Sequence, residues 1–157
     1  MKKLLSISAV LALIIGILLL AGGIWGIAFT YKSVAQEKII TAEDASIPNK
    51  PVRGPFTLKS QAEAIRGHVL KMTDGKTYAE MPRQIPKLDS SGKPVLDEKG
   101  EPVMVSNDAR NIWITATTLI TALNLAIMGY VVSGLVLLFG LVLIVIGGGL
   151  ILQKRID

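Results

Sequence analysis

The sequence of residues 111–153 is NIWITATTLITALNLAIMGYVVSGLVLLFGLVLIVIGGGLILQ, a run without a single charge. As one α-helix it would be about 64 Å long, roughly twice the thickness of a bilayer's hydrocarbon core. Two arrangements fit: a tight hairpin of two short spans, or one span that continues outward as a helix. The second is favoured, because residues 112–129 are amphipathic while residues 130–152 are almost wholly apolar and long enough for one span. The polar side of the amphipathic part consists of Thr117, Thr118, Thr121 and Asn124.

A second uncharged run, residues 4–31, lies near the start of the chain. A cleaved signal peptide is the alternative explanation, but its apolar part should be only about 7–15 residues long and end in an A-x-A-like site. This run is longer and has no convincing cleavage site. We therefore expect an uncleaved transmembrane helix.

Basic residues flank the two runs on their outer sides, with Lys2 and Lys3 before the first and Lys154 and Arg155 after the second. The positive-inside rule places both termini in the cytoplasm and the intervening segment outside it. The predicted fold class is membrane α-helical: two transmembrane helices, a small α+β extracytoplasmic segment and a long amphipathic outer extension of the second helix. The predicted boundaries are 1–3 (cytoplasmic), 4–31 (span), 32–111 (extracytoplasmic), 112–129 (outer helix), 130–152 (span) and 153–157 (cytoplasmic).

The extracytoplasmic segment shows local turn and helix signals. Ser60 and Glu63 have the S-x-x-E spacing of a helix N-terminus, apolar residues at helical spacing follow, and Asp74-Gly75 suits a helix end. The pattern L-D-x-x-G-x-P-V then occurs twice, in residues 88–95 and 96–103. Because Asp-x-x-Gly is turn chemistry, this repeat predicts a small three-strand meander of edge strands.

Several stretches resemble an uncharacterised family of small bacterial two-span membrane proteins. They are GPFT at 54–57, TDGKTYAE at 73–80, VLDEKGEPV at 95–103 and the start of the helix from Asn111-Ile112-Trp113 to Leu123-Asn124. The resemblance implies a protein of the bacterial plasma membrane and supplies no activity. Some members of that family carry a ring-opening dioxygenase label, but such an iron site needs two histidines and a carboxylate, and this chain has only His68.

Small residues at four-residue spacing predict close packing of the spanning helices, within one chain or between copies. The helix-packing candidates are Ser8, Ala12, Gly16, Gly22, Gly26, Gly129 and Ser133. The outer helix presents apolar surface that would not remain bare in water, so it should pack on the outer segment, on another subunit or on the membrane surface. The interface candidates are Trp113, Leu119, Ile120, Leu123, Asn124 and Ile127.

The sequence offers little material for chemistry. Cysteine is absent, which excludes disulfides and thiolate metal sites. His68 is expected to be a half-exposed helix residue with one hydrogen bond, the alternative being a pH sensor. The acids Glu80, Asp89, Asp97, Glu98 and Glu101 fall in turns and at a helix end, where they are expected to be solvated. We therefore expect no enzyme, no cofactor, no metal, no nucleic acid and no small-molecule substrate.

The predicted function is a non-catalytic, membrane-anchored structural or assembly protein. Its partners would be membrane lipids and either further copies of the chain, as a homo-oligomer, or a larger membrane complex. The alternative is an accessory subunit of a larger bacterial membrane complex, respiratory or transport.

Overall fold

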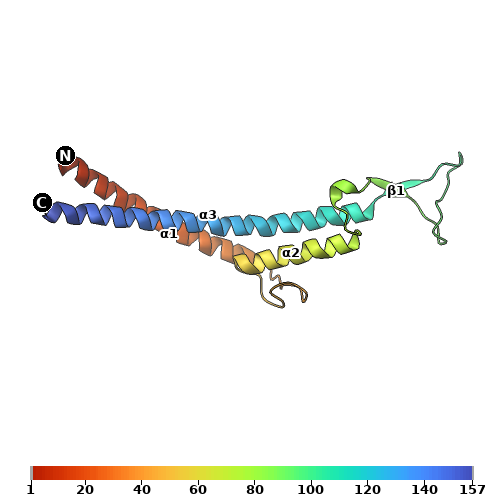
Figure 1. Cartoon of the computed structure of the whole chain (residues 1–157), viewed down its shortest axis with the longest axis horizontal. Coiled ribbons are helices and arrows are strands. Elements are labelled where there is room, and N and C mark those ends of the chain that lie inside the picture. Colours follow the sequence, from red (N-terminus) through yellow and green to blue (C-terminus); the bar gives the residue numbers. More distant parts are fainter. Residues whose placement is uncertain (1, 157) are drawn as a thin grey trace.

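The computed structural model describes residues 2–156 of the chain, and in the terminal helices the side chains of residues 3–153. The protein is mostly helical, with one small two-stranded sheet among the described residues. Along the chain the elements are α1 (Lys2–Gln36), α2 (Pro55–Met72), the 3-10 helix η1 (Tyr78–Glu80), β1 (Gln84–Pro86), β2 (Met104–Ser106) and α3 (Asp108–Ile156). Figure 1 shows a long rod with both termini at one end and the strands at the other.

The long helix α3 is the axis of the molecule. It is continuous over 49 residues, about 74 Å, so no hairpin turn interrupts the uncharged run. Its C-terminal half packs antiparallel against α1, and its N-terminal half packs against α2. Helix α2 follows α1 along α3, and together they make the second layer of the rod.

Helices α1 and α3 are both long and apolar enough to cross a membrane, by length and composition. Each is longer than its predicted span: α1 extends past residue 31 to Gln36, and α3 unites the predicted outer helix 112–129 with the predicted span 130–152. The helix boundaries and the boundaries of the uncharged runs differ because helical backbone hydrogen bonding does not stop where charged side chains begin. Met1, Asp157 and the side chains of Lys2, Lys154 and Arg155 lie outside the described part, so the cytoplasmic assignment of 1–3 and 153–157 rests on sequence alone.

Two apolar clusters hold α2 on α3. In the first, Leu58 is fully buried and contacts Val34, Val52, Ala62 and Leu123. The second joins Val69, Met81, Trp113 and Ala116. The clusters lie one after the other along the α2–α3 contact, so the half of the rod away from the termini is a two-helix stalk.

Helix α2 begins earlier than the sequence signal indicated. Its N-cap is Gly54 and Pro55 occupies the first turn, where the Oγ1 atom of Thr57 accepts hydrogen bonds from the N–H groups of Arg53 (3.1 Å) and Gly54 (3.2 Å). Ser60 is therefore inside the helix, and the prediction that it caps the helix with Glu63 was wrong. Its buried hydroxyl instead accepts the Ile47 N–H at 2.9 Å and so ties the loop 37–54 to α2. The local S-x-x-E signal was overridden by this tertiary contact.

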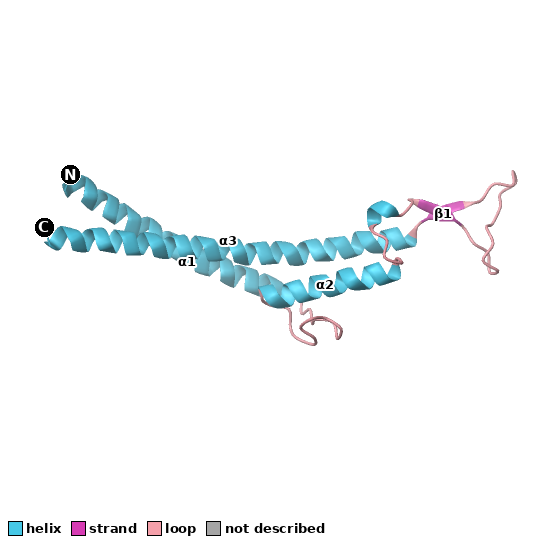
Figure 2. Ribbon diagram, viewed as in Figure 1, coloured by secondary structure: helices cyan, strands magenta, loops and turns pink. Residues whose placement is uncertain are grey.

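The tip of the rod differs from the predicted three-strand meander. Only β1 and β2 form a ladder, while each L-D-x-x-G-x-P-V repeat closes a separate bridged turn, Leu88 with Pro94 and Leu96 with Pro102. Three backbone hydrogen bonds of 2.7–2.8 Å then join Lys87, Val95 and Val103 in a ring. Because these residues are eight apart, the repeat produces a three-way junction of backbone hydrogen bonds, and Figure 2 shows the loops that extend beyond the strands.

Candidate functional site

The contact between α1 and α3 is built from small residues spaced seven apart. Ala9, Gly16 and Gly23 on α1 face Gly147, Gly140 and Ser133 on α3 in antiparallel order. A Cβ added to Gly140 would lie 2.6 Å from the Leu20 nitrogen and 2.7 Å from the Gly16 carbonyl oxygen. The helix backbones thus approach closely, as small residues permit.

The helix-packing candidates fall into two groups. Gly16, Gly26, Gly129 and Ser133 lie in the contact: Gly26 faces Ser133, and Gly129 faces Thr30. Gly22 faces open space and Ser8 is exposed, while Ala12 is half-buried. The four-residue spacing missed Ala9, Gly23, Gly140 and Gly147, which a search at the seven-residue spacing of antiparallel helix pairs would have found.

The outer-helix candidates are mostly used within the chain. Trp113 and Leu123 are buried, and Ile120 and Ile127 pack against the first cluster. Leu119 is 49% exposed, and Asn124 is also exposed. The sequence left open whether this face packs on the outer segment, on another subunit or on the membrane surface. In the structure, α2 of the same chain covers much of it.

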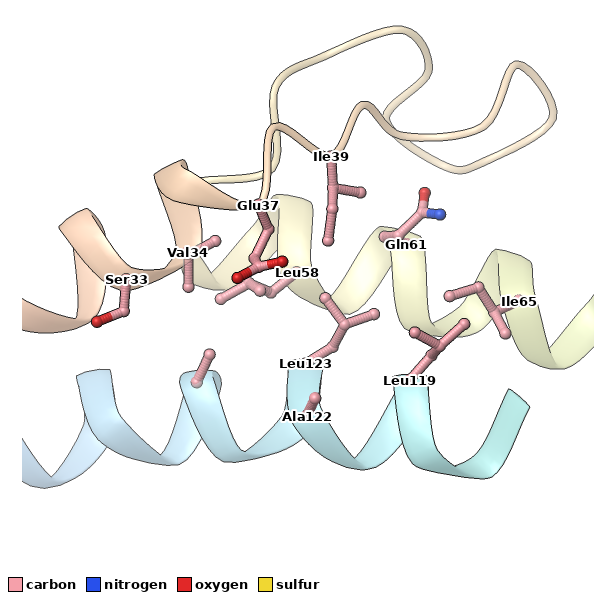
Figure 3. A pocket seen from close by; sticks show the side chains of 11 residues that line it. Ser33, Val34, Glu37, Ile39, Leu58, Gln61, Ile65, Leu119, Ala122 and Leu123 are labelled. Atoms are coloured by element: carbon pink, nitrogen blue, oxygen red, sulfur yellow. The ribbon is translucent and has the colours of Figure 1, made fainter. Parts of the chain in front are cut away.

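An open apolar groove remains along the stalk between α2 and α3. The part next to the end of α1 has a volume of about 450 Å³, and the adjoining part has a volume of about 280 Å³. Ile65 and Leu119 line both parts, so the two form one elongated feature. The larger part is within the size range of ligand pockets, about 300–1,000 Å³. Figure 3 shows the larger part, with Val34, Leu58 and Ile65 opposite Leu119 and Leu123.

One carboxylate extends into this apolar groove. Glu37, just past the end of α1, points its side chain over Leu58 in Figure 3. Within the described part of the chain, no hydrogen bond or ion pair joins that carboxylate to another residue. A basic group entering the groove would find a partner there.

The single histidine fastens the loop 37–54 to α2. The Nε2 atom of His68 lies 2.8 and 2.9 Å from the two carboxylate oxygens of Asp44, and Lys71 Nζ lies 3.9 Å from the same carboxylate. The hydrogen bond from His68 lowers the pKa of Asp44 below its usual value of 3.8. The His68 side chain is 45% exposed, so this is a surface clamp between loop and helix.

The acids of the tip are occupied by their own turns. Asp89 Oδ1 accepts the N–H groups of Ser91 (2.8 Å) and Lys93 (2.9 Å), and these bonds lower the pKa of Asp89. Asp97 Oδ1 likewise accepts the N–H groups of Lys99 and Glu101. At the start of η1 the Thr77 N–H donates to Glu80, which lowers the pKa of that acid. These carboxylates stabilise turns, and the described residues contain no group of three His, Asp or Glu placed to hold a metal ion.

The chain matches no protein-family model, and comparisons with curated proteins and with solved structures find no match either. The similarity to small bacterial two-span proteins therefore rests on the residues quoted from the sequence. The features with functional potential are the α1–α3 contact and the groove of the stalk.

Proposed function

We propose that this is a non-catalytic, membrane-anchored assembly protein of the bacterial plasma membrane. In this proposal α1 and α3 cross the bilayer, both termini are cytoplasmic, and the stalk and tip project outside. The length of the helix contact supports it: from Ala9 to Thr30 on α1 the small-residue contact extends about 32 Å, close to the hydrocarbon thickness of about 30 Å. The resemblance to bacterial two-span membrane proteins is part of the same proposal.

The observation that carries an assembly role is the open groove on the stalk. A two-helix stalk covers only part of each helix, and the groove left between α2 and α3 is lined mostly by apolar side chains. Amphipathic partner helices bind with their apolar face in hydrophobic grooves of this kind. The function we infer is therefore to present this groove at a fixed height above the membrane.

The accessory-subunit alternative has a specific observation in its favour. The small residues that could have paired separate copies are largely used between α1 and α3 of one chain. The Glu37 carboxylate in the groove would pair with a basic residue on a partner. A larger membrane protein with a basic, amphipathic segment outside the bilayer would fill the apolar groove and pair with the Glu37 carboxylate.

The test is purification from native membranes in mild detergent through a C-terminal tag, followed by native mass measurement. A whole multiple of 16.8 kDa plus lipid supports self-assembly, and larger proteins in fixed ratio support the accessory subunit. The variant Leu119→Glu should release the partner in either case, because a charge would replace an apolar side chain that lines both parts of the groove. Thr118→Glu is the control, since the neighbouring Thr118 is exposed and lines neither part. A bare monomer from native membranes, or equal release by both variants, would contradict the proposal.

A further inference from the structure

Two tyrosines fix the loop residue Arg53 at the outer end of the α1–α3 contact. The Arg53 guanidinium donates from Nη1 to the Tyr31 hydroxyl at 3.1 Å and lies 5.9 Å from the centre of that ring. From the opposite helix, the Tyr130 hydroxyl donates to the Arg53 carbonyl oxygen. Because Tyr31 is the last residue of the predicted span 4–31 and Tyr130 is the first residue of the predicted span 130–152, the loop that leads into α2 is held level with the outer ends of both predicted spans.

Phe56, three residues further on, is the most exposed large apolar side chain of the described residues. It is 79% exposed and lies in the first turn of α2, at the end of α2 that adjoins α1 in Figure 1. A ring stack of Trp25 and Phe29, also exposed, lies on α1 within about two turns of Tyr31. Aromatic side chains near the end of a spanning helix are typical of the membrane–water interface.

Arg53 provides a cation at the same level. No ion pair joins it to an acid in the described part of the chain, whereas Lys59 on the next turn of α2 pairs with Glu63 at 3.7 Å. A guanidinium that is held in place by a hydroxyl and lacks a carboxylate partner is suited to bind phosphate oxygens. The combination of this cation with an exposed ring matches the two parts of a phospholipid: a charged head and an apolar chain.

We propose that Arg53 and Phe56 form a contact site for anionic phospholipid of the outer leaflet, with the guanidinium on the headgroup phosphate and the Phe56 ring at the boundary with the acyl chains. This inference rests on the proposed function, because it requires α1 and α3 to span the bilayer. It goes further by assigning the start of α2 to the membrane surface. The contact fixes the angle at which the stalk leaves the membrane.

The absence of cysteine makes a direct test possible, because any introduced cysteine is the only one in the chain. Phe56→Cys, Met72→Cys and Leu138→Cys would each receive a spin label in nanodiscs of phosphatidylcholine and phosphatidylglycerol, with collision rates measured against oxygen and a water-soluble nickel chelate. Met72 is the matched control, since it is 63% exposed at the opposite end of the same helix, about 24 Å away. Leu138, 57% exposed in α3, reports the span itself.

We expect the label at 138 deep in lipid, the label at 56 in the interfacial region and the label at 72 in water. Labels at 56 and 72 that are equally exposed to water would overturn the contact site while leaving the spans intact. A label at 138 in water would overturn the spanning helices, and with them both proposals.

The role of Arg53 is tested separately by the lipid that the protein retains when it is purified again in detergent from the same mixture of phosphatidylcholine and phosphatidylglycerol. Arg53→Gln should lower the ratio of retained phosphatidylglycerol to phosphatidylcholine about fivefold, the effect of one cation near an anionic surface. Lys59→Gln, which removes a cation already paired with Glu63, should leave the ratio close to that of the unaltered protein. Equal retention in the Arg53 variant and the unaltered protein would exclude phosphate binding by this residue.

Discussion

Trp113 shows how one side chain connects the two helices of the stalk. It is 4% exposed, packs with Val69 and Met81, and donates from Nε1 to the Lys76 carbonyl oxygen at 2.8 Å and the Thr73 hydroxyl at 3.2 Å. The indole therefore satisfies the backbone just after α2 while its ring fills the contact with α3. A buried Trp whose N–H has a partner contributes both apolar area and a hydrogen bond.

Trp113→Phe should lower the free energy of unfolding by about 1–3 kcal/mol, because the smaller ring leaves space in a buried contact and the Nε1 hydrogen bonds are lost, so that the Lys76 carbonyl oxygen keeps only the Thr73 hydroxyl as a donor. The measurement is thermal or denaturant unfolding in detergent micelles, followed by circular dichroism. Trp25→Phe is the control, since Trp25 is 69% exposed and should give a change near zero. A similar small loss in both variants would mean that the Nε1 hydrogen bonds contribute nothing to stability.

The Asp44 clamp should make loop docking sensitive to acid. The pKa of Asp44 is lowered in the folded protein, so its stabilising effect is fully present above the usual value of 3.8 and is lost as the pH falls through the lower folded value. Between about pH 5 and pH 2 the amide protons of the loop should lose protection more in the unaltered protein than in Asp44→Asn. Hydrogen exchange by mass spectrometry measures this, and identical pH profiles in the two proteins would exclude the clamp.

At the scale of elements, the helix pair depends on glycines at which an added Cβ would clash with the backbone of the opposite helix. Gly140 is closed off in this way by Leu20 and Gly16, while Gly148, two turns away on the same helix, faces open space. Both lie in the same helix, so helix propensity favours alanine equally at the two sites. Any difference between the two substitutions therefore reports the contact.

Gly140→Ala should destabilise the α1–α3 pair by about 1–3 kcal/mol, the usual cost of overpacking, because two backbone segments would have to move apart. Gly148→Ala should be neutral or stabilising by up to about 1 kcal/mol. Thermal unfolding of both variants in the same detergent measures the difference in stability between them. Destabilisation of equal size at the two positions would show that α1 and α3 do not approach as closely as described.

The tip is held by hydrogen bonds within each Asp-x-x-Gly turn and by backbone hydrogen bonds that join the two turns. Gly92 and Gly100 have positive φ values of 79° and 80°, and each lies in a turn whose Asp oxygen accepts backbone N–H groups. The ring of Lys87, Val95 and Val103 then holds the two turns together. This segment has little apolar packing, so its order depends on backbone hydrogen bonds.

At the scale of the whole molecule, the rod places the termini and the tip at opposite ends. If α1 and α3 span the membrane, the tip must lie on the side opposite the termini. The basic residues beside both termini favour the cytoplasm for that end. Because the chain has no cysteine, a single cysteine can be introduced at the tip or beside a terminus and labelled there.

Ser91→Cys at the tip should react with a membrane-impermeant maleimide on intact cells, whereas Gln153→Cys should react only after the membrane is permeabilised. The physical reason is the positive-inside orientation of two antiparallel spans. Gel-shift detection of the labelled protein gives the result. The reverse pattern would indicate inverted topology, and labelling of both cysteines on intact cells would exclude a pair of membrane spans.

The sequence alone determined the two long apolar helices, the end of α2 before Asp74-Gly75 and the turn at each repeat. Those features depend on neighbouring residues: uncharged runs, residues suited to positive φ, and Asp side chains that reach their own backbone. The sequence also placed His68 on a helix, although the identity of its partner, Asp44, required the fold. For these features the local signal was sufficient, whereas the equally local S-x-x-E signal at Ser60 was overridden by a tertiary contact.

Only the tertiary structure decided which surfaces meet. It selected Ala9, Gly16 and Gly23 over the four-residue pattern of Ser8, Ala12 and Gly16, because the rotation of α1 about its axis is fixed by the fit to α3. It covered much of the outer helix with α2, moved the start of that helix to Pro55, and joined residues eight apart into a ring. These outcomes depend on contacts between residues distant in the chain, which compete with local signals and are settled only when the helices pack.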